Sequence, residues 1–336
     1  MRLLSPRRSK TIALIVGAFV VVATILIALK WKEVSQVLAQ ATWQSTVVAV
    51  ACCLASDVCL SYGYVLVNRA FSIGMRSLEL LEIGFVSSTL NNVMALAGAP
   101  AHSMRVMLIK QRGVDSGEIV AASLFHSFAS NVVILALFIV GLVSLLFGHV
   151  VLGSSPATVI FVVVMVMALL VVVTAMMVVR SLRKWVLRLV KTVWKWASHR
   201  DIGPFMADLD AALSKGLGAF KRHRLLLVGL VLVEVADWAL SAGGLWFCFA
   251  ALGKGPSLNV LLAGFSIGIS AGNLSMVPGG LGIQEASMAG VFALLGVSLA
   301  HAALAAILFR VTNNFIPFFV SLPFYAHLMR RRANTN

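Results

Sequence analysis

The sequence is poor in charged residues, and most of those it has are of one sign. Only 12% of its 336 residues are charged, whereas 60% are hydrophobic. Soluble globular domains carry about 25% charged residues. The composition therefore excludes such a domain and indicates a polytopic membrane protein. Lysine and arginine outnumber the acidic residues by 27 to 12, which indicates cytoplasmic loops rather than a nucleic-acid partner.

Residues and motifs for metal or nucleotide chemistry are also scarce. The chain has four cysteines, all inside apolar runs and without metal-ligand spacing: Cys52, Cys53, Cys59 and Cys248. We interpret them as small packing residues. There is no P-loop and no H-E-x-x-H string, so we expect no metal, no cofactor and no ATP-driven pumping by this chain.

Long apolar runs make up most of the chain. A helix needs about 20 apolar residues to cross a bilayer. Six runs reach that length, at about 11–29, 45–68, 118–147, 157–179, 225–252 and 299–328. The first is too long for the apolar core of a signal peptide and no cleavage site follows it, so we interpret it as an uncleaved span.

Two further stretches are apolar but broken. They lie at about 79–113, with "NNVMALAGAPAHSMRVMLIKQRG", and at about 257–297, with "MVPGGLGIQEAS". Broken segments suit re-entrant hairpins, which occur only where protein or a water-filled cavity covers the freed backbone groups. We therefore predict an all-α polytopic membrane protein with six full spans and two re-entrant helical hairpins.

The charges predict an orientation for this layout. Six crossings and two re-entrant hairpins place both termini on one side, with the segments 69–112 and 180–224. The four segments of that side, 1–10, 69–112, 180–224 and 329–336, hold 23 of the 27 lysines and arginines. Because positive charge marks the cytoplasmic side, we predict a multi-pass inner-membrane protein with cytoplasmic termini and with 149–156 and 253–256 outside.

The two halves of the chain resemble each other in sequence. A shift of 180 residues aligns Asp57 with Asp237, Ser61 with Ser241, Gly63 with Gly243, Ser77 with Ser257, and Gly84-Phe85 with Gly264-Phe265; a further slip of three aligns Asn131 with Asn314. The aligned spans run in opposite directions, so we predict an inverted repeat, a plan of secondary transporters with a site near the midplane. The alternative is that two hydrophobic halves share only their composition.

The predicted organisation is a single transmembrane domain, 1–336. Repeat one covers about 11–148, and repeat two covers about 157–179 plus 225–328. Between them, the basic segment 181–224 has an apolar set at helical spacing and a cationic set mostly opposite: Leu182, Trp185, Leu189, Val193 and Trp196 against Arg183, Lys184, Arg188, Lys191 and Lys195. This pattern predicts an amphipathic helix on an anionic cytoplasmic leaflet or an extension of the fourth span; a loop that only sets the topology is the alternative.

Ionisable residues within the apolar segments are candidates for function, because each costs about 2.5–3.5 kcal/mol in a membrane on insertion scales. They are Asp57, Glu234, Asp237, Glu285, Arg310 and, in the first hairpin, Arg105. His126 and His301 are weaker candidates, since a neutral histidine bonded to a backbone carbonyl is commoner. The repeat mates Asp57 and Asp237 either bind substrate or cap the broken helices.

Glu285 lies five residues after the Pro-Gly-Gly turn. A helix beginning near Gly280 would offer free N–H groups as an anion site at membrane depth. The repeat mate of Glu285 is Arg105, of opposite charge. A Glu–Arg pair, with Arg310 as a partner, would neutralise both charges and could open to receive a charged headgroup; the alternative is an ion pair that only holds helices together.

The string "VPGGLGIQE", followed by a span with "FRVTNN", resembles the transmembrane flippase region of the lysylphosphatidylglycerol synthase family. The matching residues are Pro278, Gly279, Gly280, Gly282 and Glu285, and Arg310 and Asn313 fit the next span. The resemblance implies movement of a lipid headgroup across the bilayer: an aminoacyl phospholipid, or a polyprenyl-linked or hopanoid-related lipid. Two-part members carry an aminoacyl-transferase domain, which does not follow "RRRANTN" here, so we expect no synthesis of lysyl lipids.

The leading hypothesis is a lipid flippase or transporter, which is not an enzyme. Its candidate substrate-binding residues are Glu285, Arg310, Arg105, Pro278, Gly279, Gly280, Gly282, Asn313, Asp57 and Asp237. The alternatives are an intramembrane lipid-phosphate enzyme, for which His102 and Ser103 lie beside Arg105, and an accessory scaffold of a lipid or glycan synthesis complex. The expected partners are the lipid substrate and anionic lipids, with a second copy of the chain or a lipid-synthesis enzyme as further candidates.

Overall fold

The computed structural model describes residues 41–94, 99–147, 156–198, 203–222, 224–253, 255–274 and 282–333, and these residues form helices without any strand. The predicted all-α class is therefore confirmed. The helices are α3 (Trp43–Ala70), α4 (Ser77–Met94), α5 (Ala99–Ile109), η1 (Lys110–Arg112), α6 (Ser116–Phe147), α7 (Pro156–Val178), α8 (Arg180–Ser198), α9 (Gly203–Arg222), α10 (Arg224–Ala251), α11 (Leu258–Leu274), α12 (Ile283–Leu294), α13 (Leu299–Arg310), η3 (Val311–Phe315) and α14 (Ile316–Ala333).

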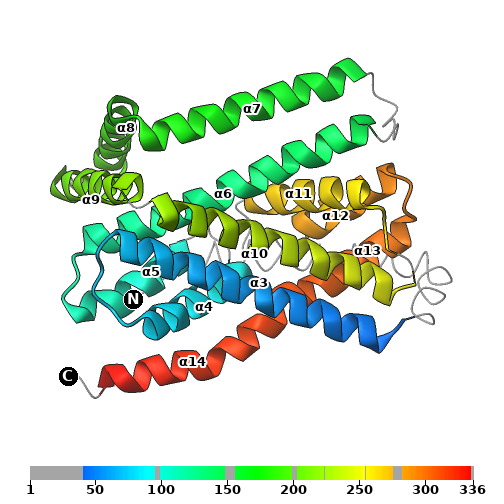
Figure 1. Cartoon of the computed structure of the whole chain (residues 1–336), viewed down its shortest axis with the longest axis horizontal. Coiled ribbons are helices and arrows are strands. Elements are labelled where there is room, and N and C mark those ends of the chain that lie inside the picture. Colours follow the sequence, from blue (N-terminus) through cyan, green and yellow to red (C-terminus); the bar gives the residue numbers. More distant parts are fainter. Residues whose placement is uncertain are drawn as a thin grey trace.

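Four helices of the described residues are long and apolar enough to cross a membrane. They are Trp43–Ala70, Ser116–Val143, Arg224–Ala251 and Leu299–Arg330, and they match four of the six predicted runs. Helix α7 begins and ends within one residue of the predicted run 157–179. The predicted first span, 11–29, lies outside the described residues. The long helices run side by side along the longest axis of the molecule (Figure 1), as in a multi-pass membrane protein.

Both broken segments form two separate helices. Their second arms are short: α5 has 11 residues and α12 has 12. At 1.5 Å per residue these arms extend about 17 and 18 Å, against a hydrocarbon core of about 30 Å, so neither arm can cross alone. The α4–α5 pair and the α11–α12 pair lie toward opposite ends of the molecule (Figure 1).

The helix breaks differ slightly from the predicted positions. In the first broken segment, "NNVMALAGAPAHSMRVMLIKQRG", the second helix already begins at Ala99, so residues 99–103 are helical and not part of the break. The helix expected to begin near Gly280 begins at Ile283. Gly282, directly before it, has a φ of 84°, a left-handed backbone conformation that glycine adopts without steric cost.

Helices α3 and α10 pack tightly along each other through small residues (Figure 1). A Cβ added at Gly244 of α10 would lie 2.6 Å from Cys53 Sγ of α3, so the glycine lets the two backbones approach closely. Cys53 and Cys248 are buried on either side of Thr312, with Sγ–Oγ1 distances of 3.8 and 3.5 Å. They act as packing residues, as expected.

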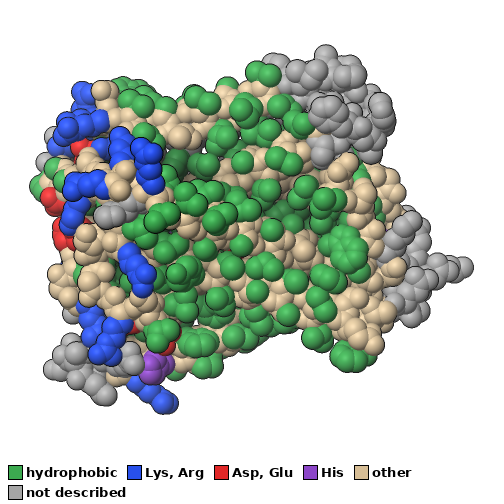
Figure 2. All heavy atoms as spheres, in the orientation of Figure 1, with side chains coloured by type: hydrophobic (Ala, Val, Ile, Leu, Met, Phe, Trp, Pro, Cys, Tyr) green, Lys and Arg blue, Asp and Glu red, His purple; other side chains and the backbone are tan. Residues whose placement is uncertain are grey.

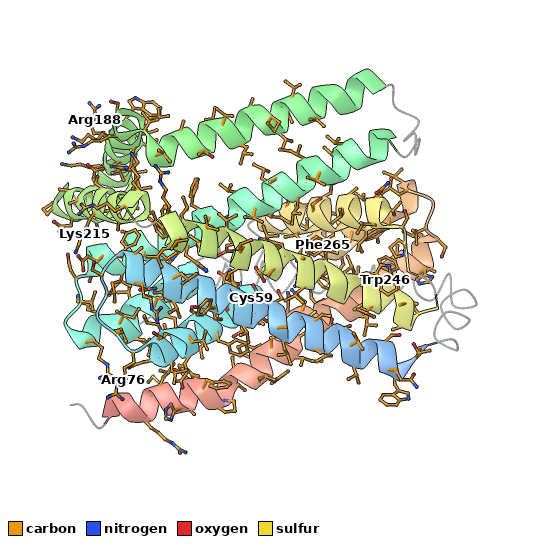
Figure 3. The ribbon with its side chains drawn as sticks, in the orientation of Figure 1. Cys59, Arg76, Arg188, Lys215, Trp246 and Phe265 are labelled. Carbon is orange, nitrogen blue, oxygen red and sulfur yellow. The ribbon has the colours of Figure 1, made fainter. Side chains whose placement is uncertain are left out.

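One end of the molecule is strongly basic. Lysine and arginine side chains gather there over α8 and α9 and beside the end of α14 (Figure 2), and Arg76, Arg188 and Lys215 all lie at this end (Figure 3). Lys215 of α9 pairs with Glu118 of α6 at 2.9 Å, which anchors the basic helices to a membrane-crossing helix. Described parts of the segments that were predicted to be cytoplasmic therefore share one end.

The basic segment is helical, but one of its arginines is not on the solvent face. Arg183 was predicted to belong to the cationic face of the amphipathic helix. It is instead 5% exposed, and its Nε donates to Asp210 of α9 at 2.7 Å, because burial of a guanidinium requires a carboxylate partner. Trp185 and Leu189, of the predicted apolar face, are 52% and 49% exposed. The side chains of Val193, Lys195 and Trp196 lie outside the described part.

Candidate functional site

A polar cavity of about 200 Å³ lies in the middle of the helical body. Its wall comes from α3, α4, α5, α6, α10, α11, α12 and η3. Cys59 of α3 is labelled near the centre of the molecule (Figure 3), and the wall residues Asp57 and Leu60 lie next to it along the same helix. Serines and asparagines form much of the wall, together with two carboxylates, one guanidinium and one imidazole. Polar groups at this depth are costly unless they serve a pathway or a ligand.

The two aspartates of the sequence repeat meet at this cavity. Asp57 of α3 and Asp237 of α10 are 4% and 5% exposed and both line the wall. The Ser56 hydroxyl donates to Asp237 Oδ1 at 2.5 Å, whereas Oδ2 of Asp57 has no hydrogen-bond partner within the described ranges. Both side chains come from the middle of long helices, so the structure does not place them as caps of the broken helices. Both carboxyl groups line the cavity, where their oxygens can accept hydrogen bonds from a ligand.

Arg105 of α5 lines the same cavity. Its Nε donates to Ser87 Oγ at 2.8 Å, and its guanidinium lies 4.0 Å from the centre of the Tyr64 ring. The side chain is 3% exposed, and Nη1 has no hydrogen-bond partner in the part of the chain that the structure describes. A hydrogen bond and a cation–π contact thus hold the guanidinium in place, while one of its N–H groups is available to a phosphate or carboxylate.

Glu285 and Arg310 form the ion pair that the sequence suggested. Glu285 also accepts a hydrogen bond from the Gly282 N–H at 2.8 Å, so its own carboxylate occupies the helix N-terminus that was expected to hold an external anion. Neither residue lines the cavity wall. Gln284 does line it, and its Oε1 accepts a hydrogen bond from Arg310 Nη2 at 3.3 Å. Pro278, Gly279 and Gly280 lie outside the described residues.

A π-helical turn brings two asparagines to the cavity. The turn Val311–Phe315 interrupts the last long helix, and π-turns of this kind are frequent at functional sites. Asn313 Oδ1 accepts from Ser241 Oγ at 3.2 Å, and Asn314 Nδ2 donates to the carbonyl oxygen of Asn92 at 3.3 Å. Asn313 was a predicted site residue, and it does line the cavity.

Several wall residues were not identified from the sequence. These include Ser56, Ser88, Asn91, Asn92, Ser127, Ser130 and Gln284. The doublets "NN" at 91–92 and 313–314 were the available signal, because two adjacent amides are unusual in apolar segments. The π-turn, which contributes two adjacent residues to the cavity wall, has no clear sequence signature.

The two intramembrane histidines both contact backbone carbonyls, as expected. His126 Nε2 lies 3.0 Å from the oxygen of Leu60, and His301 Nε2 lies 3.3 Å from the oxygen of Phe249. His126 has an additional neighbour, because its Nε2 is also 3.3 Å from Glu234 Oε1. Glu234 is fully buried on α10, beside the cavity but not on its wall.

Alanine at Gly63 is expected to perturb this region, whereas alanine at its repeat mate Gly243 is not. A Cβ at Gly63 would lie 2.7 Å from Glu234 Oε1 and 3.3 Å from His126 Nε2, but one at Gly243 would meet nothing within 4 Å. We expect Gly63→Ala to lower the free energy of unfolding by about 1–3 kcal/mol. Gly243→Ala, in a helix interior, is expected to raise it by about 0.5–1 kcal/mol. Denaturant unfolding in micelles measures both, and equal effects would show that the close approach is not present.

The fold and the cavity define a polytopic, all-helical membrane protein with a polar internal site. The chain belongs to the family of the lysylphosphatidylglycerol synthase transmembrane region, whose model matches residues 11–321. A phosphatidylglycerol lysyltransferase of Staphylococcus aureus is 24% identical over 269 residues, which cover 80% of this chain and 27% of that protein. A UPF0104 membrane protein of Methanothermobacter thermautotrophicus is 28% identical over 104 residues, covering 31% of this chain and 29% of that protein. The matches thus span less than a third of these relatives.

Proposed function

We propose that this protein moves a polar, phosphate-headed lipid across the cytoplasmic membrane, as a flippase or transporter. The observation that carries the proposal is the central cavity, in which Arg105, Asp57 and Asp237 lie among membrane-crossing helices. A lipid headgroup can occupy such a cavity while its acyl chains stay in the bilayer. The staphylococcal relative is named for a reaction on phosphatidylglycerol, which supports a phospholipid as the class of substrate.

The charges of the cavity favour a headgroup with both a phosphate and an amino group. Arg105 has an N–H group to donate to a phosphate, and Asp57 has a carboxylate oxygen to accept from an ammonium, neither with a partner within the described ranges. Hydrogen bonds to charged groups are worth about 1.5–3 kcal/mol each. Among the three substrate classes considered, an aminoacyl phospholipid carries both groups, so the charges favour it over a polyprenyl-linked or hopanoid-related lipid.

An inverted repeat is part of this proposal, and the lengths of the helices support it. Helices α3 and α10 each have 28 residues, α4 and α11 have 18 and 17, and α5 and α12 have 11 and 12. The last helix of repeat one, α6, has 32 residues, as has Leu299–Arg330 in repeat two. With α7 as the repeat mate of the predicted span 11–29, each proposed repeat consists of three spans and one re-entrant hairpin. The two repeats together then have six spans and two re-entrant hairpins.

The packing of the helices supports the same repeat. Helix α6 of repeat one packs against α11 of repeat two, and α14 of repeat two packs against α4 of repeat one. The last helix of each repeat therefore contacts the broken pair of the other. Transporters with this plan expose a midplane site to each side in turn by moving one repeat against the other, which is the motion that a flippase requires.

An intramembrane lipid-phosphate enzyme has less support. Its candidate residues His102 and Ser103 lie beside Arg105 on α5, but only Arg105 and Ala101 of that helix line the cavity. Among the described residues there is no cluster of three metal-ligating side chains. The accessory scaffold does not account for the charged cavity.

Replacing Arg105 by glutamine is expected to stop lipid movement, because the phosphate loses its charged donor. The assay uses vesicles that contain the full chain and an acyl-chain-labelled phosphatidylethanolamine, and an impermeant quencher measures transfer between leaflets. We expect at least about a tenfold lower rate, equivalent to 1.4 kcal/mol. Arg112→Gln is the matched control, since Arg112 is an exposed arginine paired with Glu79 away from the cavity. Wild-type vesicles with no transfer above protein-free vesicles would contradict the proposed function.

The basic end is proposed to face the cytoplasm, with the exposed Trp185 and Leu189 at the surface of an anionic leaflet. Lys184 and Arg188 are exposed beside them on α8. In a cysteine-less background, a cysteine at Lys215 is expected to react with an impermeant thiol reagent only after the cells are opened. A cysteine at Ser257, an exposed residue after α10, is expected to react in intact cells. The reverse pattern would invert the orientation.

A further inference from the structure

His126 and Glu234 form a buried acid–base pair beside the cavity, between α6 and α10. His126 is 3% exposed and lines the cavity wall, whereas Glu234 is 0% exposed and lies behind that wall. Their closest N–O distance is 3.3 Å. Neither oxygen of Glu234 has a hydrogen-bond partner in the described ranges. The proposed binding of the lipid headgroup does not involve this pair.

The histidine's contacts determine where a proton can be added. A carbonyl oxygen only accepts, so the Nε2 that lies 3.0 Å from the oxygen of Leu60 carries its hydrogen in both protonation states. A further proton therefore adds at Nδ1. The resulting imidazolium is stabilised by the Glu234 carboxylate at 3.3 Å, since a buried carboxylate is costly unless it has a close partner.

The surrounding charges also favour a proton on this pair. The titratable groups that face it are Asp57, Cys59 and Tyr64 from α3, His102 and Arg105 from α5, and Asp237 from α10 itself. Together with Glu234, the two aspartates give this cluster three carboxyl groups, and Arg105 is the one guanidinium of the described cavity wall. With one guanidinium for three carboxyl groups, a proton held by the pair lowers the negative charge that this buried cluster has to carry.

We propose that His126 and Glu234 bind one exchangeable proton, which leaves when the cavity takes up the amino group of a lipid, so that lipid and proton move in exchange. The inference rests on the proposed function. The ammonium brings one positive charge to Asp57 and Asp237. The N–H bond at Nδ1 of His126 breaks, and its proton leaves through the cavity that the imidazole lines. The ammonium thus replaces the proton as the positive charge next to the aspartates, while the phosphate of the same headgroup is held by Arg105.

The proton site can be tested without transport. Nitrogen NMR of the full chain in nanodiscs, with its seven histidines labelled in the ring, distinguishes neutral from doubly protonated imidazole. At neutral pH we expect one doubly protonated ring whose signal disappears in His126→Gln and becomes neutral in Glu234→Gln. His301→Gln is the matched control, because His301 also contacts a carbonyl oxygen, and it should leave the signal unchanged. A neutral His126 in the wild-type chain would overturn the proposal, even if Glu234→Gln does not fold.

The exchange is tested in vesicles with a pH difference across the membrane. Labelled phosphatidylethanolamine, which has an amino group, is compared with labelled phosphatidylglycerol, which has none. One pH unit is expected to change the ratio of the two transfer directions for the amino lipid by up to about tenfold, and His126→Gln should remove this dependence. If the ratio of the two transfer directions does not change with the pH difference, the exchange is overturned and the proposed function stands. If neither lipid moves in wild-type vesicles, the proposed function fails, and the NMR result still decides the proton site.

Discussion

Replacing Glu285 by alanine is expected to destabilise the protein by about 3–5 kcal/mol, since this is the usual cost of removing one partner of a buried ion pair. The side chains of Arg310 and Glu285 are 7% and 12% exposed, so water cannot solvate the remaining guanidinium well. The substitution also removes the acceptor of the Gly282 N–H, which adds the loss of a helix cap, worth about 1 kcal/mol. Denaturant unfolding in micelles measures the change.

Glu79→Ala provides a matched control for this result. Glu79 also pairs with an arginine, Arg112, but that arginine is 39% exposed. We expect a loss of less than about 1 kcal/mol, as for other surface ion pairs. Glu285→Gln should fall between the two, because glutamine keeps an acceptor for Gly282 but removes the charge.

This expectation differs from the one that the sequence alone supports. From the sequence, Glu285 and Arg310 are candidate substrate-binding residues, with an ion pair that only holds helices together as the alternative. If they bind substrate, Glu285→Gln should stop transport without unfolding the protein. In the structure the two residues bind each other and lie off the cavity wall. If Glu285→Gln keeps the wild-type stability and stops lipid transfer, the pair serves transport and the structural role proposed here is wrong.

The double substitution Asp57→Asn and Asp237→Asn is expected to lower the transfer of an amino lipid by about two orders of magnitude. Each substitution removes a charged hydrogen bond to the ammonium, worth about 1.5–3 kcal/mol, and both positions lie on the cavity wall. An amide oxygen at position 237 can still accept from Ser56, which donates to Asp237 at 2.5 Å in the wild-type chain, so we expect the fold to persist. Transfer of labelled phosphatidylethanolamine in vesicles measures the loss.

A lipid without an amino group is the control for this prediction. Transfer of labelled phosphatidylglycerol should change much less, because its headgroup makes no ammonium contact. Glu118→Gln provides a second control, since Glu118 pairs with the exposed Lys215 at the basic end. If both lipids slow equally in the double variant, the aspartates do not recognise an amine and the assignment of their role is wrong.

Much of the candidate site could be predicted from single residues. Asp57, Asp237, Arg105 and Asn313 were each identified in the sequence, and each lines the cavity. An ionisable or amide side chain in an apolar run can be recognised without a structure, because placing it in a bilayer costs free energy whichever way its helix is rotated. Glu285 and Arg310 could not be distinguished from the cavity residues in this way, since charge alone does not show whether two residues face a ligand or each other.

The sequence by itself determined the membrane class, the helical fold, the positions of four long helices and the two breaks, because these depend on apolar length and on turn residues within one segment. Apart from the Glu285–Arg310 pair, which the sequence suggested, only the tertiary structure decided which polar groups meet. Ser56 reaches Asp237 across 181 positions of the chain, and Asn314 reaches Asn92 across 222. The approach of His126 to Glu234 likewise depends on Gly63, whose missing side chain leaves the space they occupy. Such contacts arise from the rotation and spacing of packed helices, which no pattern along one helix specifies.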